Sequence, residues 1–180
     1  MYTKPNGTYS YGSASSCSNC SAGRYPNEDK TRCYSCPGGT YSNEGDSECT
    51  PCPEGTHSNS YRTDCLNCDL GYYSREGSSI CTICPGGTYS NDRAAECYNC
   101  LAGYFSKAGA SECIKCQSGT YSYIRSSSCH NCQAGYYSNG DQTDCLPCSP
   151  GYYSNEGASE CTRCPDGTYS SEGSSSCHTI

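Results

Sequence analysis

The chain has 180 residues, of which 21 are cysteine, and it carries a formal net charge of −7 at pH 7. This negative charge argues against a nucleic-acid partner, because proteins that bind nucleic acids present a basic surface. Leu, Ile and Phe together number only ten, and Val and Trp are absent. Such a sequence cannot build an ordinary apolar core. Its cysteine content, above the ~8–10% that marks disulfide scaffolds, indicates that disulfide bonds hold the fold.

The cysteines also predict the compartment. Thiols at this density stay paired only under oxidising conditions, so we expect an extracellular or cell-surface location. No apolar run approaches the ~20 residues of a membrane span, and we expect none in this segment. The first twenty residues also lack the apolar stretch of a signal peptide. We therefore expect the sequence to be a piece of a longer or processed chain.

A 16-residue repeat organises the sequence. The cysteines that open each Cys-x-x-Cys, together with the last cysteine of the chain, are Cys17, Cys33, Cys49, Cys65, Cys81, Cys97, Cys113, Cys129, Cys145, Cys161 and Cys177. The closing cysteines are Cys20, Cys36, Cys52, Cys68, Cys84, Cys100, Cys116, Cys132, Cys148 and Cys164. The pattern predicts residues 1–19 as a degenerate first repeat and residues 20–179 as ten 16-residue repeats in one continuous rod.

The repeat that begins at Cys36 illustrates the predicted elements. Residues 37–39 (Pro-Gly-Gly) predict a turn, residues 40–42 a short strand, and residues 43–45 a second turn, followed by an extended piece leading into Cys49. The glycine that recurs at the end of the first turn predicts a positive φ angle. No helix is expected, since the apolar residues show no 3.6-residue period. The predicted fold class is therefore small, disulfide-rich and mostly irregular, with short β-hairpins.

A ring and a serine follow the recurring glycine in nearly every repeat. The rings are Tyr9, Tyr25, Tyr41, His57, Tyr73, Tyr89, Phe105, Tyr121, Tyr137, Tyr153 and Tyr169. A single hairpin is not stable alone in water, so we expect neighbouring repeats to stack. The ring is expected to cover a disulfide of its own or the adjacent repeat. A second tyrosine precedes the ring in alternate central repeats, at Tyr72, Tyr104 and Tyr136, which predicts a 32-residue structural repeat whose consecutive units point to opposite sides.

Three pairing schemes treat the repeats alike. In the first, the closing cysteine of one pair bonds the opening cysteine of the next, which gives Cys20–Cys33, Cys36–Cys49, Cys52–Cys65, Cys68–Cys81, Cys84–Cys97, Cys100–Cys113, Cys116–Cys129, Cys132–Cys145, Cys148–Cys161 and Cys164–Cys177, and leaves Cys17 unpaired. In the second, each Cys-x-x-Cys closes on itself. In the third, bonds skip a repeat. The first is favoured because the small ring of a closed Cys-x-x-Cys is strained and typical of redox sites. Under it, Cys36–Cys49 is a closed loop and Thr50-Pro51 is a hinge to the next loop.

The motif Cys-Pro-x-Gly-Thr-Tyr-Ser followed by Cys-x-x-Cys, as in residues 36–52 and 84–100, resembles the ephrin-receptor-type cysteine-rich repeat. That repeat is related to the first loop of tumour-necrosis-factor-receptor modules. The resemblance implies local second-to-first disulfides, little regular secondary structure and an elongated extracellular rod. Long uniform arrays of this kind are similar to surface or flagellar-hair (mastigoneme-like) proteins of protists and algae. Every loop here has the same spacing, however, whereas receptor modules that bind cytokines alternate loop types.

The sequence offers little support for a metal site, a catalytic site or a cofactor site. Ten Cys-x-x-Cys pairs could form zinc sites, but the interval between pairs is shorter than in zinc ribbons. His57, His130 and His178 do not cluster, and the acidic turns lack the spaced ligands of a calcium loop. No catalytic constellation or cofactor motif can be assembled, so we expect no enzyme activity and no cofactor. Sequons predict N-glycosylation at Asn6 and Asn19.

The predicted function is structural. We expect a disulfide-laddered repeat rod that builds an extracellular filament, appendage or surface coat. Its partners would be copies of itself or other matrix and filament proteins, with glycans attached. The alternative is a ligand-binding or stalk segment of a cell-surface receptor ectodomain. Near-identical repeats favour the structural interpretation, because a ligand site usually needs one unit that differs from the others.

Overall fold

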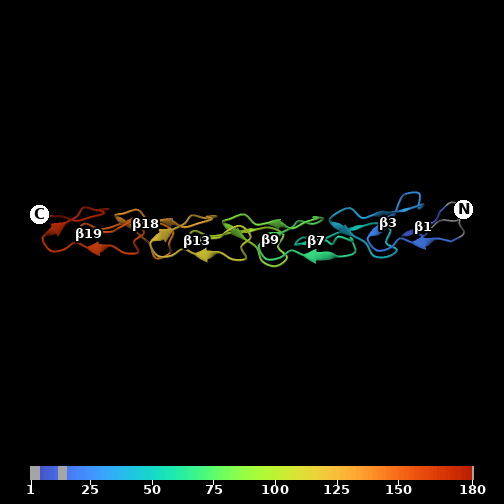
Figure 1. Ribbon diagram of the computed structural model, residues 1–180, viewed down its shortest axis with the longest axis horizontal. Coiled ribbons are helices and arrows are strands. Elements are labelled where there is room, and N and C mark those ends of the chain that lie inside the picture. The colour runs from blue at the N-terminus through green and yellow to red at the C-terminus, as the bar shows by residue number, and fades with distance from the viewer. Residues whose placement is uncertain (1–4, 12–15, 180) are drawn as a thin grey trace. The chain divides into compact units, whose positions relative to one another are not determined.

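The computed structural model describes residues 5–11 and 16–179 (Figure 1). The chain forms two compact units, one of Met1–Ile83 with Asn91–Cys97 and the other of Cys84–Ser90 with Tyr98–Ile180. The described residues contain no helix. They form short strands that pair in antiparallel two-stranded hairpins, one for each repeat. The predicted fold class is therefore confirmed: a disulfide-rich tandem repeat of short hairpins and irregular chain.

The strands are two or three residues long. In chain order they are β1 (Thr8–Tyr9), β2 (Ser18–Asn19), β3 (Arg24–Pro26), β4 (Cys33–Ser35), β5 (Thr40–Tyr41), β6 (Thr50–Pro51), β7 (Thr56–Ser58), β8 (Cys65–Asn67), β9 (Tyr72–Tyr73), β10 (Thr82–Ile83), β11 (Thr88–Tyr89), β12 (Tyr98–Asn99), β13 (Tyr104–Phe105), β14 (Ile114–Lys115), β15 (Thr120–Tyr121), β16 (His130–Asn131), β17 (Tyr136–Ser138), β18 (Cys145–Pro147), β19 (Tyr152–Tyr153), β20 (Thr162–Arg163), β21 (Thr168–Tyr169) and β22 (His178–Thr179).

The second strand of each hairpin lies where the sequence predicted a hinge. In the repeat that begins at Cys36, β5 pairs with β6 in the register Thr40↔Pro51 and Tyr41↔Thr50. The prediction that the second extended piece ends at Cys49 was wrong, and so was the prediction that Thr50-Pro51 is a hinge. The two residues inside the Cys-x-x-Cys are a strand, because their main chain has partners on the ring-bearing strand. The disulfide-closed loop thus runs from Cys36 to Cys49, whereas the hairpin runs from Thr40 to Pro51.

The recurring glycine has the predicted backbone conformation. Its φ angle is positive in every repeat, from Gly7 at 73° to Gly167 at 81°. The glycine ends a tight turn, which the amide of Thr40 closes by donating to the carbonyl of Pro37 at 3.2 Å. Residues with a Cβ atom rarely adopt such angles, so glycine is the natural choice at this position.

Main-chain hydrogen bonds join each repeat to the next one within a unit. The amide of Gly23 donates to the carbonyl of Ser42 at 2.9 Å, and the amide of Gly45 donates to the carbonyl of Cys20 at the same distance. The amide of Ser42 in turn donates to the carbonyl of Arg62 at 3.1 Å. These bonds satisfy groups that a free hairpin would leave to water, which explains why one repeat depends on its neighbours.

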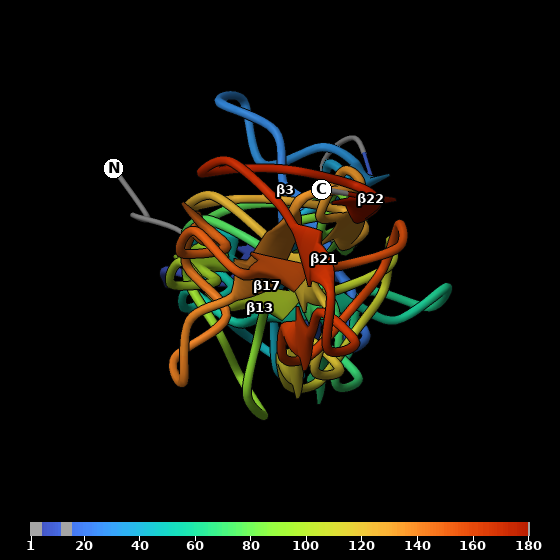
Figure 2. The ribbon, with the colours of Figure 1, turned by 90° about the vertical axis from the view of Figure 1, so that its left-hand side faces the viewer.

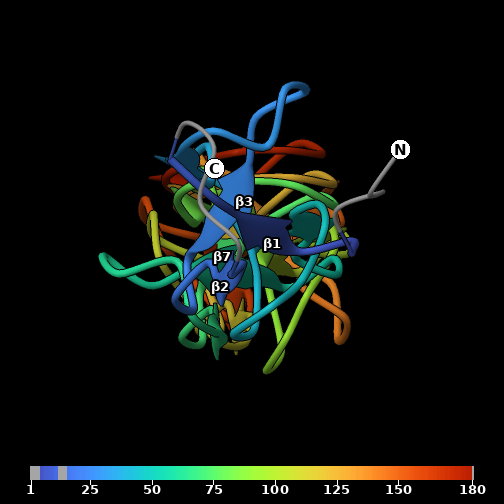
Figure 3. The same cartoon turned by 90° about the vertical axis from the view of Figure 1, so that its right-hand side faces the viewer.

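The recurring glycine also contacts the repeat after the next. A Cβ atom on Gly87 would lie 2.0 Å from the carbonyl oxygen of Arg125, and one on Gly39 would lie 1.9 Å from that of Gly77. Backbone therefore packs directly on backbone between alternate repeats. Viewed end-on, β1, β3 and β7 of the first unit project onto the middle of the picture with loops around them (Figure 3), and so do β13, β17 and β21 of the second unit (Figure 2). Consecutive repeats that point to opposite sides would bring alternate repeats into such contact. The predicted 32-residue structural repeat nevertheless stays a prediction.

The core of each unit consists of cysteine and serine. The closing cysteine of each Cys-x-x-Cys is at most 7% exposed, and the serine after the ring is fully buried at Ser42, Ser90, Ser106 and Ser122. Each buried hydroxyl needs a hydrogen-bond partner. The Oγ of Ser106 donates to the carbonyl of Thr88 in the preceding repeat at 2.8 Å. The serine therefore joins two repeats at the centre of the fold.

The rings lie outside this core and are mostly half-buried. Several of them contact the cross-strand residue of the same hairpin, and Tyr9 and Tyr121 also contact the tyrosine two residues later. Ring centroids are 5.7 Å apart between Tyr89 and Tyr98, and 5.8 Å apart between Tyr121 and His130. The ring thus packs on its own hairpin, and the expectation that it covers a disulfide stays a prediction.

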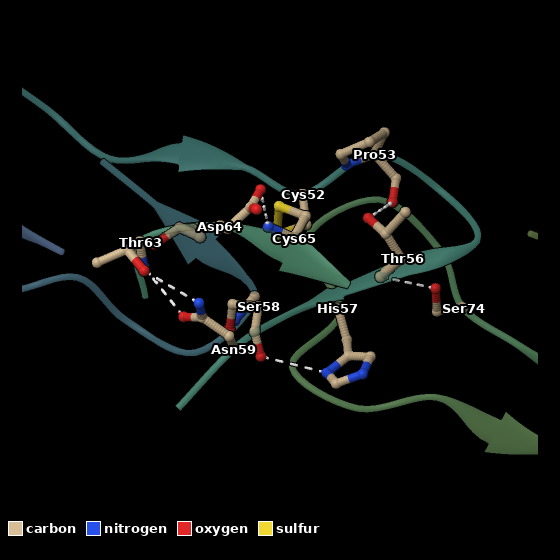
Figure 4. The surroundings of a disulfide bond; sticks show 12 residues. Cys52, Pro53, Thr56, His57, Ser58, Asn59, Thr63, Asp64, Cys65 and Ser74 are labelled. Atoms are coloured by element: carbon tan, nitrogen blue, oxygen red, sulfur yellow. Dashed lines mark hydrogen bonds between the residues drawn. A yellow bond between two sulfur atoms is a disulfide. The ribbon is translucent and has the colours of Figure 1, made fainter. Parts of the chain in front are cut away.

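Among the repeats whose second turn is described, three have a different form of it. Where most repeats place the positive φ angle on Gly45 or an equivalent residue, these place it one residue later, on Lys30, Arg62 and Gln142. An asparagine three residues earlier holds the turn. In the repeat of Figure 4, Nδ2 of Asn59 donates to Oγ1 of Thr63 at 3.0 Å, and Oδ1 of Asn59 accepts from the Thr63 amide at 3.0 Å. We call these the Asn–Thr turns; they span residues 27–31, 59–63 and 139–143.

Candidate functional site

The cysteines form a ladder of local disulfides. The bonds join Cys20–Cys33, Cys36–Cys49, Cys52–Cys65, Cys68–Cys81, Cys100–Cys113, Cys116–Cys129, Cys132–Cys145, Cys148–Cys161 and Cys164–Cys177, each across 13 residues. Cys84 and Cys97 are also disulfide-bonded. The structure therefore follows the first of the three pairing schemes. Cys17 carries a free, half-exposed thiol, and in the sequence the repeat position of its partner is Lys4, which lies outside the described residues.

Figure 4 shows the surroundings of one disulfide, Cys52–Cys65. Cys52 is fully buried, whereas Cys65 is half-exposed. The amide of Cys65 donates to the Asp64 carboxylate at 2.8 Å, and Oγ1 of Thr56 donates to the Pro53 carbonyl at 2.7 Å. These partners position the backbone around the bond, and because Cys52 and Cys65 are bonded to each other, neither is a thiolate that could bind a metal. The zinc alternative is displaced, since zinc needs free thiolates.

The histidines are not brought together. Nδ1 of His57 lies 3.2 Å from the Ser58 carbonyl, while His130 and His178 pack against Tyr121 and Tyr169. Within the described part of the chain, no group of three or more His, Cys, Asp or Glu side chains could hold a metal ion.

Carboxylates of the acidic turns make hydrogen bonds within their own turn and to another repeat. The carboxylate of Asp46 accepts from the Asn43 amide, and Oε1 of Glu156 accepts from Nδ2 of Asn131 at 3.1 Å. These carboxylates therefore have partners within the fold.

The two predicted glycosylation sites differ in their surroundings. Asn6 is exposed on the turn before Gly7, and its Oδ1 accepts from Nζ of Lys30 at 3.2 Å. Its amide nitrogen, the atom that would carry a glycan, lies at the surface. Asn19 is also exposed, but its side chain lies within 3.4 Å of where a Cβ on Gly45 would be, and the next residue, Cys20, is buried and bonded. Of the two sites, Asn6 has the more open geometry.

Of the tyrosines that precede a ring, now including Tyr152, all but the half-buried Tyr136 lie at the surface. Tyr72, Tyr104 and Tyr152 are 36%, 37% and 41% exposed. One further exposed tyrosine, Tyr123, packs edge-on against Tyr121 with ring centroids 5.5 Å apart. A side-chain hydrogen bond to Tyr121 raises the pKa of Tyr123, because the bond stabilises the neutral phenol.

A cleft of about 670 Å³ lies at the first Asn–Thr turn. We call it the tyrosine groove; its lining includes Tyr25, Glu28, Asp29, Lys30, Tyr34 and Glu48, with Asn6 at one side. The rings of Tyr25 and Tyr34 meet at 65° with centroids 6.4 Å apart. Because the groove combines residues from three consecutive repeats, sequence reasoning missed it. The only available signal was the departure of residues 27–31 from the usual glycine turn.

A second cleft, of about 480 Å³, occupies the equivalent place at the second Asn–Thr turn. It has His57 where the first has Tyr25, Leu66 where the first has Tyr34, and Ile80 where the first has Glu48. A hollow thus recurs at two of the three Asn–Thr turns. The side chains that line it differ from repeat to repeat.

Comparison with models of known protein families and with curated protein sequences found no match for this chain. Among the described residues, no helix has the length and apolar character needed to span a membrane. The disulfide density itself indicates an oxidising, extracellular environment and a structural or surface role.

Proposed function

We propose that this chain is a non-catalytic structural protein whose tandem repeats build an extracellular filament, appendage or surface coat. The observation that carries the proposal is the uniform ladder: disulfides of one spacing and main-chain bonds to the next repeat recur along both units. Repetition of one bonded unit adds length without a new fold, and disulfides resist unfolding and proteolysis. Similarity to ephrin-receptor-type repeats of protist and algal surface proteins is part of this proposal.

Association between copies would use the exposed side chains. Tyrosines such as Tyr61 and Tyr123, which are 82% and 61% exposed, are the kind of residue that dominates protein interfaces. The net charge of −7 keeps separate copies soluble until specific contacts form. Glycosylation at Asn6 also belongs to the proposal, because the side chain is exposed on a turn.

Electron microscopy of the full chain, secreted from eukaryotic cells and kept oxidised, tests the structural role. We expect regular filaments or sheets with a short repeat, and loss of these assemblies after reduction and alkylation. Isolated single particles at every protein concentration would contradict the proposal and favour a segment of a receptor ectodomain. The tyrosine groove is the observation that favours this second candidate, since it makes one repeat unlike the others.

A further inference from the structure

We propose that the tyrosine groove binds a neutral saccharide, either the first sugars of a glycan carried by Asn6 or a free glycan of the same chemistry. The inference rests on the proposed extracellular function, where glycans are abundant. It assigns a ligand class to a cleft that the structural role alone does not use.

The two rings provide a platform for a sugar. Tyr34 is 50% exposed and Tyr25 is half-buried beneath the same cleft. Their edge-on arrangement leaves Tyr34 with open ring surface. The C–H face of a sugar ring is apolar and packs on the electron-rich face of an aromatic ring, as in other mixed polar and apolar ligand sites.

The polar groups of the groove suit hydroxyl groups. Glu28, Asp29 and Glu48 supply carboxylate oxygens that accept hydrogen bonds, and Lys30 supplies a donor. Three carboxylates against one ammonium give the lining a net negative charge, which disfavours phosphate, sulfate and uronic acid groups. The volume of about 670 Å³ falls within the range of small-molecule sites, roughly 300–1,000 Å³.

Asn6 connects this groove to glycosylation. Its Oδ1 is held by Nζ of Lys30, so its Nδ2 lies beside the groove. Attachment forms a bond between Nδ2 and the anomeric carbon of an oligosaccharide. It breaks the bond from that carbon to the diphosphate of a lipid-linked donor, which leaves as the lipid diphosphate, and it releases one amide proton. The first sugars then begin at the groove that Tyr34 also lines.

The second cleft provides an internal contrast. It has a comparable hollow, but Leu66 and Ile80 replace the exposed ring and one of the carboxylates, and Gly38 stands where Asn6 does. A leucine also occupies the equivalent position of the third Asn–Thr repeat, at Leu146. Leucine therefore fits this site in the fold, and Tyr34→Leu removes the platform while keeping the hairpin.

The test uses the full chain secreted from eukaryotic cells, in four forms. These are the wild type, Tyr34→Leu, Asn6→Gln, and Tyr98→Leu as the matched control. Tyr98 occupies the same position in another hairpin and also pairs with a ring, that of Tyr89. One readout is the rate at which a peptide-N-glycosidase releases the Asn6 glycan from folded protein. The other is the NMR shift of the Tyr34 ring in Asn6→Gln on addition of diacetylchitobiose.

If the groove holds the Asn6 glycan, release is about fivefold slower in the wild type and in Tyr98→Leu than in Tyr34→Leu, since aromatic stacking is worth roughly 1 kcal/mol. If it binds free glycans, diacetylchitobiose shifts the Tyr34 ring in Asn6→Gln whether or not Asn6 is modified in the wild type. Either result supports the inference and identifies the source of the sugar. The inference is overturned if diacetylchitobiose does not shift the Tyr34 ring and, in addition, the release rates are equal or Asn6 is unmodified. Filament formation is read separately by microscopy, so failure of the structural proposal is distinguishable.

Discussion

The recurring glycine of the first turn can be required for its backbone conformation, for close packing, or for both. Two glycines of this chain distinguish these requirements. Gly87 and Gly167 have nearly equal φ angles of 82° and 81°. A Cβ on Gly87 would meet the carbonyl of Arg125 at 2.0 Å, whereas a Cβ on Gly167 would meet nothing within 4 Å. Backbone conformation alone therefore accounts for Gly167, and close approach of another repeat adds a second requirement at Gly87.

We predict that Gly87→Ala destabilises its repeat far more than Gly167→Ala. Gly167→Ala carries only the positive-φ cost of about 1 kcal/mol, while Gly87→Ala must also displace a backbone segment, so its cost exceeds about 3 kcal/mol. Amide hydrogen exchange of residues 84–90 and 120–128 measures the difference. Similar exchange in the two variants would show that the contact between alternate repeats is unimportant.

Tyr121 and Tyr123 are coupled through their hydroxyl groups. The hydrogen bond to Tyr121 raises the pKa of Tyr123, so folding favours the protonated phenol. A raised folded-state pKa contributes stability that is complete below the ordinary tyrosine pKa and is lost as the pH rises through the folded value.

We predict that Tyr121→Phe lowers the pKa of Tyr123 toward its ordinary value, because the partner hydroxyl is gone. NMR titration of ring-labelled protein between about pH 8 and pH 12 follows Tyr123 directly, since ordinary tyrosine titrates near 10. Tyr89→Phe serves as the control and should leave the Tyr123 titration unchanged. An unaltered Tyr123 pKa in Tyr121→Phe would contradict the coupling.

At the scale of the hairpin, the second turn exists in two forms that the sequence distinguishes. The Asn–Thr turns pair an asparagine with a threonine four residues later, as in Asn139 and Thr143, and Nδ2 of Asn139 donates to Oγ1 of Thr143 at 2.9 Å. Their strands are three residues long, where the other hairpins have two. The side-chain bonds stabilise a turn in which a residue other than glycine has a positive φ angle. Both clefts described above lie beside such turns.

We predict that Asn59→Ala loosens the second Asn–Thr turn by about 1–2 kcal/mol, because two side-chain hydrogen bonds are lost. Exchange of the Arg62 and Thr63 amides should become faster. Ser60→Ala, on the same turn, removes an exposed side chain that makes no such bonds and should have no effect. Unchanged exchange in Asn59→Ala would show that the backbone alone specifies the turn.

The whole chain is stabilised by local closure and coupling between neighbours. Each disulfide closes a short loop, and each hairpin takes main-chain partners from the following repeat. Stability in such arrays is the sum of repeat and interface contributions, so damage should remain near its origin.

We predict that Cys116→Ala with Cys129→Ala destabilises its repeat by about 3 kcal/mol, the value for a loop of ~15 residues. Proteolytic cleavage and amide exchange should rise between residues 100 and 147, with residues 20–65 unaffected. Cys17→Ser is the control, because its thiol is free. An even rise along both units would indicate that the chain unfolds as one cooperative block.

The sequence by itself determined the period, the absence of helix, the hairpin in each repeat and the positive φ angle of the recurring glycine. These are local properties, set by residue type at fixed spacing. It favoured the observed disulfide scheme over two others, and it predicted the second strand before Cys49 when that strand is Thr50–Pro51.

Only the tertiary structure decided what is buried. The rings attract attention in the sequence, yet Ser106 is fully buried and Tyr121 is not. The reason is geometric: alternate repeats approach until backbone meets backbone at Gly87, and only small side chains fit in the remaining space. The tyrosine groove has the same origin, since it combines side chains from three repeats that are brought together only by stacking.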